Sequence, residues 1–211
     1  MTSKLDLTSK LDRLTPLAVV GGPALMALYG GIRLLDGSRD PGPGWMVGHS
    51  LMFAGLLLFG VVLAALRGRL APSGAAGRLT ADTAAGVAFA GLAASLGQIG
   101  IDLYVGAVAV DKADQHRLFD DIQSRPGVLP AFYSVGPLLF YVGLLALLVA
   151  ASTGRARTLR RWSPVLVLAG TVLAAADLAL IPAAAVLYLA ALAPLAGFGG
   201  PAGRAARLGA S

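Results

Sequence analysis

The sequence predicts an all-α fold, a polytopic bundle of six transmembrane helices with both termini in the cytoplasm. Of its 211 residues, 56% are hydrophobic and only 13% are charged, whereas globular domains in water carry roughly 25% charged residues. The apolar residues also come in blocks of about twenty, the length that crosses a hydrocarbon core of about 30 Å. Residues 1–211 are therefore expected to form a single transmembrane domain in the cell membrane.

The N-terminal segment, residues 1–13, repeats the pentapeptide TSKLD at 2–6 and 8–12. Leu recurs on one side of any helix formed here, which predicts a short interfacial helix on the cytoplasmic face, with a disordered tail as the alternative. The basic start followed by an apolar stretch is also typical of a signal peptide. That stretch is about twenty residues long and lacks a small-x-small cleavage site, so we expect an uncleaved first span.

The predicted spans can be placed from the apolar blocks. They are residues 14–35, 45–66, 83–110, 129–152, 162–179 and 182–199. The last two belong to one block that is too long for one crossing, and Asp177 and Pro182 near its middle predict a break. Small residues at Gly86, Ala90 and Ala94 predict close approach of the third helix to a neighbour.

The distribution of basic residues supports six crossings. With the N-terminus inside, most of the 17 Lys and Arg residues lie on the cytoplasmic side, as the positive-inside rule requires. Those left outside are Arg33, Arg39, Lys112, Arg117 and Arg125. A single span in place of the last two would move Arg204 and Arg207 outside and weaken this contrast.

The segment 111–127 is expected to be the longest loop. Its slight excess of acidic residues predicts that it lies outside the cell. It is followed by the fourth span, in which Pro137 should bend the helix, as Pro23 should in the first. The loop lies on the side of the membrane where the ionisable residues of the spans are expected, so it is a candidate lid.

Ionisable residues within the apolar blocks are the functional candidates, since each costs about 2.5 to 3.5 kcal/mol to insert. Asp102 shares a helix face with Gln98 and Ser95, and Asp177 stands alone in the last block. In the six-span topology both fall in the outer half of the membrane, as do His49 and Arg33. We therefore predict a polar pocket there, with Asp102, Asp177 and His49 as catalytic candidates. The predicted substrate-binding residues are Arg33, Gln98, Tyr104, Tyr133, Tyr141 and Tyr188.

Structural roles are alternatives for each of these residues. Asp177 can cap the turn between the last two spans, and Asp102 can pair with Arg33 at the interface. His49 can be a partly hydrated interfacial residue, and the tyrosines can belong to the aromatic belts at the membrane surfaces.

Several classes of chemistry are excluded by what the sequence lacks. It has no cysteine, and its two histidines make a haem or metal site improbable, so no metal and no cofactor are expected. No nucleotide-binding glycine loop, His-Glu-x-x-His helix or Gly-x-Ser-x-Gly elbow is present. The basic residues flank apolar blocks and do not alternate with aromatic residues, so the expected partners are the lipid bilayer and a hydrophobic small molecule, without nucleic acid.

The bundle of short spans, with Asp102 and Asp177 on separate spans, resembles the small multi-pass terpene cyclases of bacterial terpenoid pathways. The resemblance covers the chain in outline and extends to those two positions. It implies metal-independent cyclisation of a linear or epoxidised prenyl chain, started by Asp protonation. Two other classes stay open: a proton-coupled small-molecule transporter, in which the Asp pair relays protons, and a non-catalytic membrane accessory protein, in which the polar residues specify helix packing.

Overall fold

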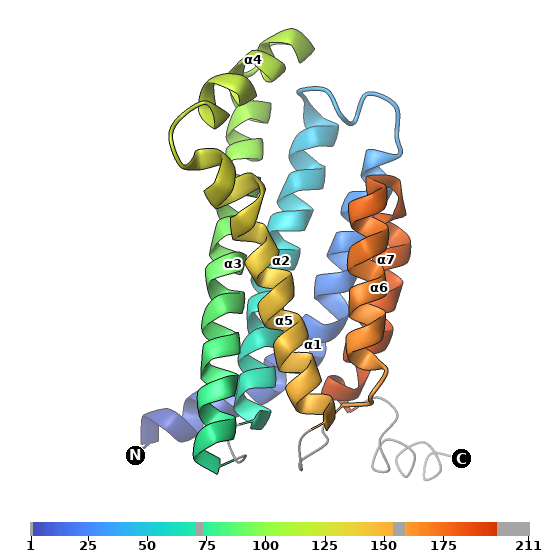
Figure 1. Ribbon diagram of the computed structural model, residues 1–211. Helices are drawn as coiled ribbons and strands as arrows, with labels where there is room; N and C mark the ends of the chain where they lie inside the picture. The colour runs from blue at the N-terminus through green and yellow to red at the C-terminus, as the bar shows by residue number, and fades with distance from the viewer. Residues whose placement is uncertain (1, 71–73, 154–158, 198–211) are drawn as a thin grey trace, which may run out of the picture.

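The computed structural model describes residues 2–70, 74–153 and 159–197, with side chains from Ser9 onward. Every regular element within these ranges is helical. The helical segments long and apolar enough to cross a membrane are Ser9–Arg33, Pro43–Leu70, Gly74–Val108, Leu129–Thr153 and Leu178–Ala196. The chain is therefore an all-helical, multi-pass membrane protein, as its composition predicts (Figure 1).

Helix α1 (Thr2–Arg33) begins within the predicted interfacial segment and continues without a break into the first span. It crosses the bundle obliquely, from the end drawn at the bottom of Figure 1 to α7 at the upper end. Thr15 donates its hydroxyl to the Leu11 carbonyl at 2.7 Å, where the two parts of the helix meet. The N-terminal segment is thus the first part of α1, because nothing in this stretch terminates the helix.

Helices α2 (Pro43–Leu70) and α3 (Gly74–Val108) form a hairpin, and α5 (Val135–Thr153) packs closely against α3. The close contact depends on glycine. A Cβ at Gly91 would lie 1.9 Å from the Phe140 nitrogen, and one at Gly143 would lie 2.4 Å from the Ala88 nitrogen. The expected approach through Gly86 is not seen, since nothing lies within 4 Å of that position.

The segment predicted as a loop at 111–127 contains a helix, α4 (Lys112–Gln123), which lies across the upper end of the bundle (Figure 1). Asp111 caps it by accepting the Asp114 amide at 2.8 Å. Its inner face carries Gln115, which is 1% exposed, and Phe119. The helix is hard to find in the sequence because its apolar stripe is short and most of its other residues are charged or polar.

The entry to α5 is irregular. A π-helical turn (η1, Leu129–Tyr133) ends at Ser134, whose backbone leaves helical geometry before α5 starts at Val135. Pro137 lies in the first turn of α5, so the bend comes just before it. The physical reason is that a proline ring clashes with the carbonyl four residues earlier and offers no N–H to it.

The last apolar block is broken at Asp177. Helix α6 (Ser163–Ala176) ends there, and a short 3₁₀ turn (η2, Leu178–Leu180) leads into α7 (Ile181–Leu192) and a final 3₁₀ turn (η3, Ala193–Ala196). The Thr171 and Tyr188 hydroxyls join α6 to α7 at 2.6 Å. Residues 198–199 of the last predicted span, and the basic residues Arg155, Arg157, Arg204 and Arg207, lie outside the described residues.

The hydrophobic core fills the lower part of the bundle, where fully buried side chains include Leu63, Leu66, Leu144, Leu147 and Leu148. The buried His and Asp side chains among the described residues, His49 and Asp102, lie instead at the upper end, where α1 ends, α2 begins and α3 ends. This division places the candidate site.

Candidate functional site

The upper end of the bundle holds a buried carboxylate beside a buried imidazole. Oδ2 of Asp102 on α3 lies 3.8 Å from Nε2 of His49 on α2. Asp102 is 8% exposed and His49 only 3%. Tyr133, at the end of η1, points its hydroxyl toward Oδ1 of Asp102 at 3.5 Å. Three helical segments therefore contribute to the surroundings of one carboxylate.

Trp45 determines which nitrogen of His49 faces Asp102. His49 Nδ1 lies 2.8 Å from the Trp45 carbonyl, which can only accept, so Nδ1 carries a hydrogen. Nε2 then carries a lone pair when the ring is neutral and a hydrogen when the ring is charged. At 3.8 Å Nε2 and Oδ2 are too far apart for a direct hydrogen bond, so the two groups form an ion pair only when His49 is protonated and Asp102 is ionised.

The Trp45 side chain also joins α2 to α3. Its indole N–H donates to the Asp102 backbone carbonyl at 2.7 Å, and its ring stacks on His49 with centroids 4.1 Å apart. On its other side it approaches Phe119 of α4, with centroids 6.1 Å apart. The sequence signal for this role was its position four residues before His49 on the same helix face.

Arg33 lies beside this cluster without pairing directly with Asp102. Its Nη1 donates to the Tyr29 hydroxyl at 3.3 Å, and its guanidinium lies 5.7 Å from the Tyr29 ring centroid. Tyr29 in turn meets His49 edge to face at 5.3 Å. The Arg33 Nε is buried and has no hydrogen-bond partner among the described residues. The ionisable side chain nearest to the Asp102 carboxyl group among those with a described contact is thus His49, and no ion pair joins Asp102 to Arg33 in the described part of the chain.

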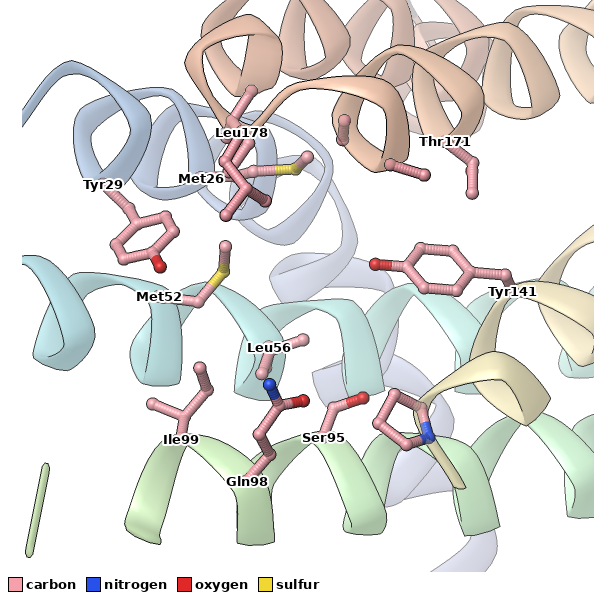
Figure 2. A pocket seen from close by; sticks show the side chains of 14 residues that line it. Met26, Tyr29, Met52, Leu56, Ser95, Gln98, Ile99, Tyr141, Thr171 and Leu178 are labelled. Carbon is pink, nitrogen blue, oxygen red and sulfur yellow. The ribbon is translucent and has the colours of Figure 1, made fainter. Parts of the chain in front are cut away.

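A partly open cavity of about 280 Å³ lies below this cluster, lined by α1, α2, α3, α5, α6, η2 and α7 (Figure 2). Its walls are mostly apolar, with Met26, Met52 and Leu56 among them. The polar residues that line it are Tyr29, Ser95, Gln98, Tyr141 and Thr171. Gln98 and Ile99 lie one turn before Asp102, and Tyr29 contacts His49, so the cavity ends next to the buried pair.

The structure brings some of the predicted site residues together and separates others. Asp102, His49, Tyr133 and Arg33 form or adjoin the upper cluster, and Gln98 and Tyr141 line the cavity below it.

The remaining predicted residues lie elsewhere. Asp177 is exposed and accepts the Ala179 amide at 2.8 Å as the cap of η2. Tyr104 is 58% exposed, and Tyr188 is buried between α6 and α7 against Thr171. Sequence reasoning missed Trp45 and Met52, whose roles depend on how helices distant in sequence pack.

The described side chains that could provide metal ligands are dispersed. No group of three or more His, Asp or similar ligands lies together within the described ranges. The chemistry that the site can offer is therefore that of a carboxyl group, an imidazole and phenol hydroxyls.

The fold and the site define a class, a multi-pass helical membrane protein with a buried carboxylate–imidazole pair above an apolar cavity. Comparisons with known protein families, curated proteins and solved structures give no match for the chain.

Proposed function

We propose that the chain crosses the cell membrane six times with both termini in the cytoplasm. Helix α6 has 14 residues, about 21 Å at 1.5 Å per residue, and would make the fifth crossing with a thinned bilayer or tilted neighbours. The start of α1 and the end of η3 lie at the same, lower end of the bundle (Figure 1). Arg67, Arg69, Arg78 and Arg161 belong to the connections at that end, which the positive-inside rule assigns to the cytoplasm.

We propose further that the protein is a membrane-embedded, metal-independent cyclase acting on a linear or epoxidised prenyl chain. The observation that carries this proposal is the buried Asp102–His49 pair at the end of the 280 Å³ cavity. A protonated carboxyl group in a water-poor place can donate a proton to an apolar substrate, and a neutral imidazole nearby can accept one at the end of the reaction.

The reaction conserves its protons. Asp102 and His49 lie just beyond the wall of the cavity, so this step requires the substrate to reach past Tyr29 and Ile99. Asp102 then gives a proton to an alkene carbon or an epoxide oxygen, and the resulting cation is attacked by a second double bond, which closes a ring. The faces of Tyr29 and Tyr141 are suited to stabilise this cation. Loss of a proton from the cyclised cation, by way of His49, restores the pair. The substrate is isomerised and no second reactant is consumed.

Asp177 is not assigned a catalytic role in this proposal. Its carboxylate caps η2 at the surface of the described structure, and Leu178 lines the cavity in its place. Asp102 is therefore the single acid, in contrast to the two carboxylates that the resemblance to terpene cyclases implies.

The test compares two isosteric variants in a host supplied with linear and epoxidised prenyl substrates. Asp102→Asn should reduce cyclic product by about 100-fold or more, because an amide cannot donate the proton. Asp177→Asn is the matched control, since Asn caps a helix as well as Asp does, and it should retain most activity. Both variants should insert into the membrane equally. Undiminished product from Asp102→Asn would overturn the proposal.

A proton-coupled transporter is the second candidate, and one observation favours it. The cavity is flanked by two helix interruptions, at Ser134 and Asp177, and is lined by the nearby residues Pro137 and Leu178. Interrupted helices commonly form the binding sites of transporters. Uptake of a solute into vesicles driven by a pH gradient, and lost in Asp102→Asn, would favour transport over cyclisation.

A further inference from the structure

Two polar side chains point into the apolar cavity and make no hydrogen bond within the described residues. These are the amide of Gln98 on α3 and the hydroxyl of Tyr141 on α5 (Figure 2). The other polar groups of the wall are occupied. Ser95 donates to the Gly91 carbonyl at 3.0 Å, and Thr171 contacts the Val167 carbonyl at 2.8 Å and the Tyr188 hydroxyl at 2.6 Å.

Both side chains are half-buried, and their polar ends face the space of the cavity. Hydrogen-bonding groups in an apolar place are usually satisfied by a water or a ligand. One or two waters would occupy only a small part of this cavity, since a water takes up roughly 30 Å³ of liquid. The volume of about 280 Å³ approaches the range of about 300 to 1,000 Å³ seen for small-molecule pockets. The space thus suits an organic molecule that brings its own polar group.

The wall of the cavity also limits the charge of that molecule. No Lys, Arg, His or Asp side chain lines it. An ionised head group placed there would lose its hydration without gaining a counter-ion. The apolar part of the wall, including Met26, Met52 and Leu56, suits a hydrocarbon body.

We propose that the cavity binds a neutral, mainly hydrocarbon molecule carrying an alcohol, carbonyl or epoxide oxygen, which Gln98 and Tyr141 recognise by hydrogen bonds. This inference rests on the proposed function and names its substrate class as an oxygenated prenyl compound, excluding a prenyl diphosphate and a plain hydrocarbon. Gln98 lies one helical turn from Asp102. Figure 2 shows Gln98 near the middle of the cavity, between Ile99 and Ser95, so an oxygen held there lies about one helical turn along α3 from Asp102.

The experiment measures binding to the purified full-length protein in lipid nanodiscs, with empty nanodiscs subtracted. The probes are farnesol, the hydrocarbon β-farnesene and farnesyl diphosphate, which share one skeleton. Farnesol should bind at least tenfold more tightly than either of the others. Equal affinity for farnesol and farnesene, tighter binding of the diphosphate, or no binding of farnesol would each overturn the inference.

Two variants remove the proposed hydrogen bonds while conserving volume. Gln98→Met and Tyr141→Phe should each weaken farnesol binding about tenfold and leave farnesene unchanged. Tyr104→Phe, at an exposed tyrosine outside the cavity, is the matched control and should bind like the original protein. Wild-type affinity for farnesol in both cavity variants would contradict the inference. If one variant fails to fold, as judged by size-exclusion profile, the other decides.

The inference and the proposed function fail in different ways. Asp102→Asn should still bind farnesol, because its side chain does not line the cavity. Selective farnesol binding without product from any prenyl substrate would remove the cyclase proposal and keep the binding site. Product formation that is unaffected by Gln98→Met and Tyr141→Phe would remove the binding site and keep the cyclase.

Discussion

The indole ring of Trp45 occupies the space that a side chain at position 106 would need. A Cβ atom at Gly106 would lie 2.2 Å from Cδ1 of Trp45, far inside contact distance. The absence of a side chain on α3 at this point lets Trp45 reach across from α2, stack on His49 and donate to the Asp102 carbonyl. The geometry of the buried pair therefore depends on a glycine that carries no chemistry itself.

Substitution of this glycine tests that dependence. Gly106→Ala should displace the indole and lower the free energy of unfolding by about 1 to 3 kcal/mol, the usual cost of overpacking. Reversible unfolding in mixed micelles measures the loss, and product formation or transport should fall with it. Gly100→Ala, where nothing lies within 4 Å, is the control and should be neutral. Equal stability of Gly106→Ala and the original protein would contradict the assigned role of Gly106.

The contact between α3 and α5 predicts a second effect. In Gly143→Ala the new methyl group would lie 2.4 Å from the Ala88 nitrogen, an atom of the backbone that cannot rotate away. The helices must separate, so we expect a loss of unfolding free energy of about 1 to 3 kcal/mol or more. Gly86→Ala on the exposed face of α3 serves as the control. Comparable stability of the two variants would show that α3 and α5 do not pack through Gly143.

Helix α4 should loosen in acid. The hydrogen bond from Arg117, with a second from the Val110 amide, holds the pKa of Asp114 below its ordinary value. A depressed carboxyl pKa stabilises the helix at pH values above the unfolded-state pKa of about 3.9, and the contribution is lost as pH falls through the lower folded-state value.

Amide hydrogen exchange across residues 112–123, corrected for intrinsic rates, measures this effect. Protection at pH 6 should exceed protection near pH 3. In Asp114→Asn, protection should be as low at pH 6 as at pH 3, because the Asn side chain does not titrate. If the pH dependence of protection persists in Asp114→Asn, another titrating group causes it.

The proposed topology can be tested with single cysteines, because the chain has none of its own. Asp36→Cys and Ser124→Cys, both exposed at the upper end, should react with a membrane-impermeant maleimide in intact cells. Ala75→Cys and Arg161→Cys, exposed in the connections at the lower end, should react only after permeabilisation. The reverse pattern would invert the orientation, and labelling of Arg161→Cys together with Ser124→Cys would exclude the proposed fourth crossing.

The sequence predicted the five long apolar helices of the described residues because their signal is local. A run of about twenty apolar residues must satisfy its backbone hydrogen bonds internally, and a helix does this from sequence neighbours alone. The same reasoning failed for α4, whose residues are polar and whose stability comes from its Asp111 cap and from contacts such as Phe119 with Trp45. It also missed that α1 continues through residues 1–13 into the first span.

The candidate site divides in the same way. The sequence identified Asp102 as a candidate, with Gln98 on the same helix face, because a charged residue in an apolar block is costly. The sequence did not reveal that Asp102 lies beside His49 instead of Arg33, or that Asp177 is exposed. Each of these depends on which helices meet and on how each helix is rotated about its axis.

The sequence by itself determined that this chain is embedded in a membrane as a bundle of apolar helices, with a few ionisable groups near one end. Only the tertiary structure decided which of these groups share a site. Hydrophobicity determines that a helix is in lipid, whereas its rotation toward its neighbours follows from shape, through glycines such as Gly106 and Gly143 and the side chains that fit against them.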